Sequence, residues 1–106
     1  MITLNQFKEC DLRVATIVAA ARVPQSEKLL LLRLSLGTEE RQILAGIAGR
    51  YTPEELIARQ IIIVANLEPR MLMGHESQGM LLAADGPEGP VLLGPDTEVA
   101  TGTPVK

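Results

Sequence analysis

The feature that most restricts the fold is a leucine-rich run between residues 29 and 36. Every second residue of this run is a leucine, namely Leu30, Leu32, Leu34 and Leu36. Arg33 and Ser35 lie between them. Because side chains two residues apart share one face of a strand, the run predicts a strand with its leucines buried and its polar residues outside. The polar segment 37–40 predicts a turn, and 41–46 predicts the returning strand of a hairpin.

The other apolar runs also favour strands over helices. Segment 12–23 holds two β-branched clusters and ends before Pro24, which predicts one long, bent strand followed by a loop over 24–28. The continuous apolar run at 60–66 is typical of a strand buried on both faces. We expect a loop at 67–78, a turn over 85–90 and an extended tail from residue 95. Two further strands are expected at 79–85 and 91–94.

Two short helices are predicted from capping signals. Thr3 followed by Gln6 fits a capping box at the start of a helix over residues 3–9. Thr52 can cap a second helix of one or two turns. Pro53 then takes the first helical position, and Glu55 completes the box.

About five strands in 106 residues, with one short helix between the third and fourth, is the element order of an OB-type barrel. The predicted fold class is therefore all-β: a five-stranded OB-fold barrel with extra terminal segments. The length favours a single domain over residues 1–106.

Charge and aromatic content limit how such a barrel binds nucleic acid. The net charge is −3, but nine Lys and Arg balance nine Asp and Glu in residues 1–84, so the excess acid lies in the last 22 residues. Charge therefore permits RNA binding without predicting it. Phe7 and Tyr51 are the only aromatic residues. A platform that stacks successive bases is excluded, which leaves recognition of backbone and shape.

Catalytic and metal-binding patterns are nearly absent. His75 is the only histidine, and although Ser77 is close, no G-x-S-x-G elbow surrounds the serine, so a Ser–His nucleophile is not expected. Cys10 is the only cysteine and is isolated from His75, so we expect no metal, no other cofactor and no enzyme activity. Cys10 is interpreted as a small packing residue after the first helix. The single cysteine, and the lack of a secretory signal or membrane span, predict a cytoplasmic protein.

Most basic side chains are interpreted individually as solvated surface charges. Arg13 has the further alternatives of pairing with Asp11 or with a neighbouring strand. Met71 and Met73 lie beside Arg70 in the expected loop. Their side chains have two alternative roles there, packing in the core or forming a contact surface.

Four segments follow one another along the chain: DLRVATIVAAARV, SEKLLLLRLSLGTEERQILAGIAGRYTPEEL, IIIVANLEPRMLMG and ESQGMLLAAD. Taken together, they closely resemble the tRNA-binding domain at the C-terminus of many bacterial methionyl-tRNA synthetases and the free-standing, structure-specific tRNA-binding proteins of bacteria. The resemblance runs from about Phe7 to Asp85. It implies a non-catalytic OB barrel that binds the outer corner of tRNA by shape more than by sequence. It also implies a homodimer formed through the chain ends, here 1–10 and 95–106, either free-standing or attached to a synthetase.

The resemblance also implies the RNA-binding positions. They correspond to Lys28, Asn66, Arg70, Ser77, Gly79 and Met80. Lys28 and Arg70 suit phosphates, Asn66 and Ser77 suit phosphate or ribose, and Gly79 suits close backbone approach. Several family members carry further lysines where this sequence has Glu68, Met71 and Met73, which predicts a weaker electrostatic contribution.

The main alternative belongs to a different functional class. A related branch of the superfamily is linked to export chaperoning, so a protein-binding, chaperone-like dimer is the rival interpretation. That branch differs in the segment that reads LAGIAGRYTPEEL here. A dimerisation appendage with only incidental RNA contact is a third possibility.

Overall fold

The leucine run forms the predicted strand, β2 (Leu30–Ser35), in the computed structural model, which describes all 106 residues. The four alternating leucines are buried, with Leu36 the most exposed of them at 5%. β3 (Glu40–Ala45) returns antiparallel to β2, with Leu32 opposite Ile43. The predicted hairpin is therefore confirmed, and its buried face supplies the leucines of the core.

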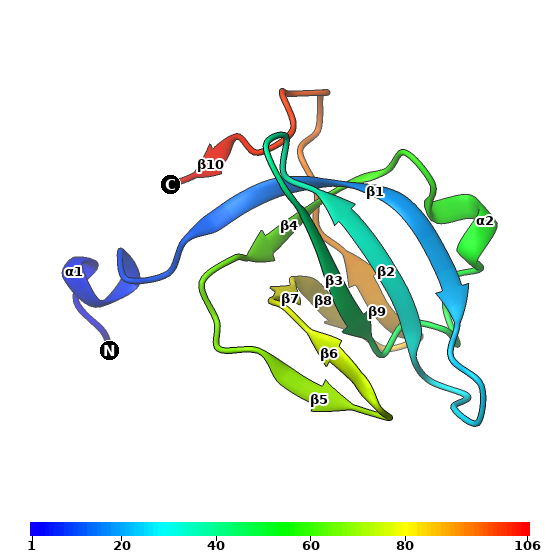
Figure 1. Ribbon diagram of the computed structural model, residues 1–106. Coiled ribbons are helices and arrows are strands. Elements are labelled where there is room, and N and C mark those ends of the chain that lie inside the picture. The colour runs from blue at the N-terminus through cyan, green and yellow to red at the C-terminus, as the bar shows by residue number, and fades with distance from the viewer.

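The long strand β1 (Leu12–Arg22) pairs with two other strands of the barrel, one along each half. Its second half pairs with β2 and its first half pairs with β4 (Gln60–Val64), both antiparallel. The register with β2 shifts between Ile17 and Ala19. Such a bulge bends a strand and increases its twist, so β1 can curve around the barrel (Figure 1).

The sheet has the order β3-β2-β1-β4-β7, where β7 is Met80–Leu81. The N–H of Gln78, just before β7, donates to the carbonyl of Gln42 on β3 at 2.8 Å. This bond links the two ends of the sheet into a nearly closed five-stranded barrel (Figure 1). The predicted OB-like fold is therefore confirmed. Its core consists of buried side chains, among them Ile61 and Ile63 on β4, which are fully buried.

Segment 67–78 differs from the predicted loop because it contains a hairpin. β5 (Arg70–Leu72) pairs with β6 (His75–Ser77). The two residues between them have positive φ, 51° at Met73 and 81° at Gly74. Positive φ at both central positions matches the right-handed twist of the flanking strands. The hairpin extends beyond the barrel at the lower edge of Figure 1.

The strand predicted over 79–85 is divided into β7 and β8 (Ala83–Gly86). Leu82 lies at the division, where its N–H donates to Ile62 and its carbonyl accepts from Leu93. The chain thus changes partners at this residue. β8 then pairs with β9 (Gly89–Leu92), which begins before the predicted final strand.

Both capped helices form. In α1 (Leu4–Phe7) the hydroxyl of Thr3 accepts from the N–H of Gln6 at 3.1 Å, and the amide oxygen of Gln6 accepts from the N–H of Thr3 at 2.7 Å. α2 (Pro53–Leu56) lies between β3 and β4 as predicted. Neither helix is long enough to cross a lipid bilayer.

The two ends of the chain lie beside the first half of β1. The tail is extended and its last element, β10 (Pro104–Val105), pairs with β1, placing Val105 opposite Leu12. Cys10 is exposed, so the prediction that it packs inside was wrong. The reason is that α1 buries none of its own residues and stands away from the barrel (Figure 1).

Candidate RNA interface

Three segments meet where β3 ends. The N–H of Ala48, in the turn after β3, donates to the carbonyl of Lys28 in the β1–β2 loop at 3.0 Å. The N–H of Leu44 on β3 donates to the hydroxyl of Ser77 on β6 at 3.1 Å. The β1–β2 loop, the turn at 46–51 and the β5–β6 hairpin therefore form one continuous surface, called here the β3 end. It lies at the lower side of the barrel in Figure 1.

Lys28 and Arg70 supply unpaired positive charge to the β3 end. Both residues are exposed, and neither has a carboxylate oxygen within 4.0 Å of its charged nitrogens. Three other arginines do form ion pairs: Arg13 with Asp11, Arg33 with Glu40, and Arg41 with Glu39. The Arg13–Asp11 pair is one of the two alternatives left open by the sequence. The unpaired charges are thus free to neutralise an anionic ligand.

Ser77 differs from the exposed contact that the resemblance implies, because it is 3% exposed. Its hydroxyl accepts from Leu44 and donates to the carbonyl of Gly79 at 3.2 Å. Both bonds are internal to the protein. In this structure Ser77 attaches the hairpin to β3, which positions Arg70 directly opposite it in the hairpin register.

Gly79 and Met80 follow the hairpin. Gly79 has a φ of 124°, and a Cβ at this position would lie 2.9 Å from the carbonyl oxygen of Val64. The backbone that lies close to Gly79 is therefore that of β4 in the same chain. The side chain of Met80 is 46% exposed, and two methionines of the hairpin, Met71 and Met73, are exposed as well.

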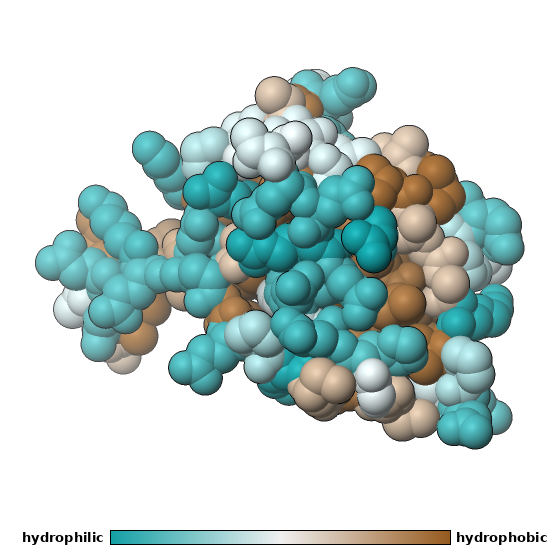
Figure 2. Space-filling model, viewed as in Figure 1, coloured by the Kyte–Doolittle hydropathy of each residue, from teal (hydrophilic) through white to brown (hydrophobic).

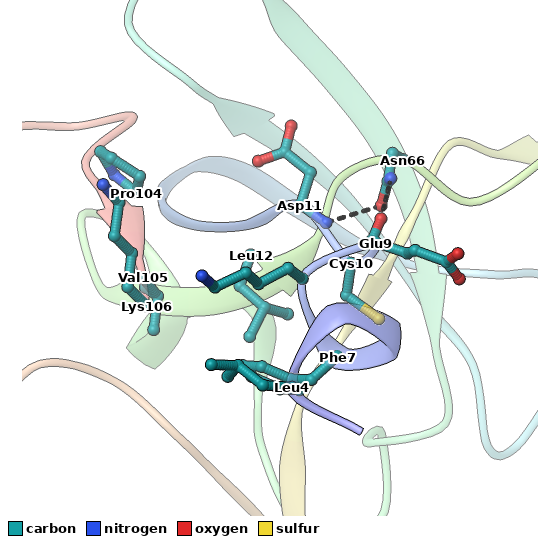
Figure 3. A pocket seen from close by; sticks show the side chains of 11 residues that line it. Leu4, Phe7, Glu9, Cys10, Asp11, Leu12, Asn66, Pro104, Val105 and Lys106 are labelled. Carbon is teal, nitrogen blue, oxygen red and sulfur yellow. Dashed lines mark hydrogen bonds between the residues drawn. The ribbon is translucent and has the colours of Figure 1, made fainter. Parts of the chain in front are cut away.

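Asn66 anchors the N-terminal segment. Its amide oxygen accepts from the N–H of Asp11 at 2.8 Å, and its amide nitrogen donates to the carbonyl of Glu9 at 2.7 Å. Figure 3 shows Asn66 beside Asp11, at the edge of a pocket between α1 and β10. The structure therefore places Asn66 with the terminal segments, whereas Lys28 and Arg70 lie at the β3 end.

The pocket beside Asn66, called here the terminal groove, has a mixed lining, in which Lys8, Asp11 and Lys106 lie around apolar side chains. Its apolar side chains come from α1, β1 and β10: Leu4, Phe7, Leu12, Pro104 and Val105 (Figure 3). Leu4 is 66% exposed and Phe7 is 41% exposed. Figure 2 shows hydrophobic residues exposed on the projecting α1 at the left of the view. A four-residue helix with no buried residue gains little stability from packing against the barrel.

The residue types considered for catalysis do not converge. The hydroxyl of Ser77 is engaged by Leu44 and Gly79, whereas His75 lies opposite Leu72 in the hairpin. No three His, Cys, Asp or Glu side chains come together as a set of metal ligands.

Comparisons with known proteins show the family of the chain. The model of the family described as "Putative tRNA binding domain" matches residues 12–104. A methionine--tRNA ligase of Thermotoga maritima is 53% identical over 104 residues, which are 98% of this chain and 16% of that protein. The corresponding enzyme of Methanothrix thermoacetophila is also 53% identical, over the whole chain and 16% of its own length. The chain thus spans about one sixth of the length of these curated relatives.

Solved structures give the same result for the fold. A "MetRS related protein" from Pyrococcus horikoshii superposes with a TM-score of 0.93 at 34% identity, covering 100% of this chain and 98% of that one. The chaperone CsaA of Bacillus anthracis superposes with a TM-score of 0.90 at 31% identity, covering 100% of this chain and 99% of that one.

The barrel and the free charges at the β3 end define the chain as a small OB-like binding module. It belongs to the tRNA-binding domain family.

Proposed function

We propose that the chain is a non-catalytic module that binds tRNA through the β3 end and acts as a homodimer in the cytoplasm. The observation that carries this proposal is the pair of exposed, unpaired cations, Lys28 in the β1–β2 loop and Arg70 on β5, in two segments that the fold brings to one surface. Phosphate contacts by such side chains supply most of the sequence-independent affinity for nucleic acid.

The distribution of aromatic residues supports recognition of shape. Tyr51 is only 7% exposed, and Phe7 lies in the terminal groove. Neither ring is placed to stack on bases at the β3 end. Binding therefore depends on phosphate and ribose contacts, whose positions follow the shape of the RNA.

The six implied residues take different roles in this proposal. Lys28 and Arg70 contact phosphates, and Met80 contributes exposed apolar surface on β7. Ser77 and Gly79 hold the hairpin and β7 in place through Leu44 and the Val64 backbone. Asn66 contributes by holding the segment before β1, which connects the RNA-binding barrel to the dimer contact.

The occupant of the terminal groove is proposed to be a second copy of this chain, so that segments 1–10 and 95–106 form the dimer contact. The support is that exposed apolar side chains of α1 line the groove together with those of β10, while Asn66 anchors the segment after α1. A twofold arrangement buries the same apolar patch on both copies. It also places two β3 ends on one RNA, which raises the affinity of a chain with net charge −3.

Attachment to a methionyl-tRNA synthetase is proposed as one of two settings, the other being a free-standing protein. In either setting the module raises affinity for tRNA in general. The support is the match to about one sixth of several methionine--tRNA ligases, together with the full-length match to a MetRS-related protein.

A chaperone-like, protein-binding dimer remains the second candidate function. It is favoured by the exposed methionines Met71, Met73 and Met80, because methionine side chains adapt to varied apolar partners. The backbone does not separate the two functions, since the CsaA and MetRS-related structures superpose on this chain about equally well.

The decisive experiment is a gel shift with whole tRNA, an isolated RNA hairpin and unstructured RNA, alongside light scattering for the mass in solution. We expect preference for whole tRNA and the mass of two chains. Affinity is expected to fall with salt at a slope equivalent to a few phosphates. A slope near zero contradicts the phosphate-contact model. Preferential binding of an unfolded polypeptide over tRNA supports the chaperone-like function instead.

A further inference from the structure

The turn after β3 contains two glycines that the fold itself does not require. Neither Gly46 nor Gly49 has a left-handed φ, and a Cβ added to either one meets nothing within 4 Å. Both are exposed, and neither N–H donates a hydrogen bond within the chain. Glycine at an unstrained, open position allows another molecule to approach the backbone closely. The turn therefore has the properties of a contact surface with free backbone donors.

Two arginines lie beside this turn on a single aromatic ring. The guanidinium carbons of Arg50 and Arg59 lie 5.6 Å and 5.2 Å from the centre of the Tyr51 ring. The ring is fixed, because Tyr51 is 7% exposed and its hydroxyl accepts from the N–H of Leu92 at 3.1 Å. Stacking on a fixed ring restricts the guanidinium groups before any ligand arrives, so less entropy is lost when they bind.

The same two arginines carry unpaired charge. Acidic residues occur nearby in the sequence, at Glu54 and Glu55 in α2 and at Glu88, but none has a carboxylate oxygen within 4.0 Å of either guanidinium. The carboxylate of Glu55 instead accepts from the N–H of Thr52 at 3.2 Å. Arg50 and Arg59 therefore remain available to an anion.

This surface is continuous with the proposed RNA-binding surface. The hydrogen bond from Ala48 to Lys28 joins the middle of the turn to the β1–β2 loop. The two guanidinium carbons are separated by at most the sum of their distances to the ring centre, about 11 Å. Two cations this close can contact phosphates a few nucleotides apart on one strand.

We propose that the turn Gly46–Arg50 within the β3 end, extended by Arg59 beyond it, is a second set of phosphate contacts for the same RNA, additional to Lys28 and Arg70. This inference rests on the proposed tRNA-binding function. Arg50 and Arg59 bind phosphate oxygens through their planar forks, and Gly46 and Gly49 let the sugar–phosphate backbone approach the turn. Binding thus extends from Lys28 around the barrel towards α2, beyond the positions that the family resemblance implies.

The charge component is tested by salt titration of whole-tRNA binding with Arg50→Gln, Arg59→Gln and the double variant. Each single change is expected to weaken binding several-fold and to reduce the salt slope by about one. Arg33→Gln is the matched control, because Arg33 is an exposed arginine already paired with Glu40. Its slope is expected to stay unchanged. If the arginines only cover Tyr51, the variants lower the melting temperature and leave the slope intact, which overturns the proposal.

The backbone component is tested with Gly46→Ala and Gly49→Ala. Open space and an unstrained backbone predict unchanged or higher stability, because alanine restricts the unfolded chain. Binding to whole tRNA is nevertheless expected to weaken several-fold. Unchanged binding in the double arginine variant and in both glycine variants overturns the second set of contacts. If Arg70→Ala still weakens binding in that case, the proposed function stands. A wild-type chain that fails to bind tRNA overturns both.

Discussion

The buried hydroxyl of Ser77 on β6 accepts a hydrogen bond of 3.1 Å from the N–H of Leu44 on β3. This bond joins a hairpin of two three-residue strands to the wall of the barrel. Every buried side-chain nitrogen and oxygen in the chain has a hydrogen-bond partner, so the contact belongs to a fully satisfied set. The position of Arg70, across the hairpin from Ser77, depends on it.

Replacing Ser77 by alanine is expected to destabilise the protein. The change leaves the N–H of Leu44 buried without a partner, which costs about 1–3 kcal/mol. For a chain of this size we expect a melting temperature lower by several degrees in thermal unfolding followed by circular dichroism. Binding of tRNA is expected to weaken because the hairpin is no longer held.

The control for that variant is Ser35→Ala, which removes an exposed hydrogen bond to the N–H of Gly37. Its melting temperature is expected to change less, because water can replace the lost acceptor. If Ser77→Ala instead kept its melting temperature and lost tRNA binding, Ser77 would contact the RNA directly.

The alternating leucines of β2 and the capping boxes were predictable because their signals are local. A period of two defines a strand face, and Thr3 with Gln6 defines a helix start within four residues. The bend of β1 was also expected from the length of its apolar run. These elements and their order were sufficient to predict a five-stranded barrel.

The hairpin at 70–77 was missed because its turn residues are unusual. A turn with two positive φ values is normally recognised by Asn-Gly or Asp-Gly, whereas this one has Met73 and Gly74. In the sequence Met-Gly, only the glycine is a residue type that favours positive φ. The division at Leu82 was missed for another reason, since a change of pairing partner depends on strands distant in the sequence.

The residue types of the candidate site came from the resemblance, and their role in RNA binding stays a prediction. Lys28 and Arg70 are exposed and unpaired, as phosphate contacts require. The burial of Ser77 and the anchoring bonds of Asn66 depend on contacts across 33 and 57 residues of sequence. Such long-range pairs are fixed by the closed barrel and leave no local signal.

Replacing Lys28 or Arg70 by alanine is expected to weaken tRNA binding while leaving the barrel folded. Both side chains are exposed and make no ion pair, so stability is expected to change by less than about 0.5 kcal/mol. Each change is expected to reduce the salt slope of binding by about one, measured by filter binding over a range of salt concentrations. Arg33→Ala serves as the charge-matched control. Equal slopes for wild type and both variants place the phosphate contacts elsewhere.

Replacing Asn66 by alanine is expected to loosen the segment that leads to α1. The change removes the bonds to Asp11 and Glu9, and each exposed bond contributes at the lower end of about 0.5–1.5 kcal/mol. We expect faster amide hydrogen exchange in residues 4–11 and weaker self-association, with little change in the barrel strands. Asn5→Ala, at an exposed asparagine of α1, is the control and is expected to leave exchange at residues 9–11 unchanged. Uniformly faster exchange across the barrel would assign Asn66 a global structural role.

Replacing Phe7 by aspartate is expected to convert the proposed dimer into a monomer. The substitution replaces an apolar ring of the terminal groove by a charged side chain at the surface where a second copy is proposed to pack, and burying a carboxylate there is costly. Light scattering is expected to show the mass of one chain. Because the two β3 ends no longer act on one RNA, affinity for tRNA is expected to fall by about 10²-fold or more.

Val18→Asp is the matched control, since Val18 has the same 41% exposure on the barrel wall. If both variants stay dimeric, the dimer contact lies outside the terminal groove; if Phe7→Asp is monomeric with undiminished affinity, one β3 end is sufficient for tRNA.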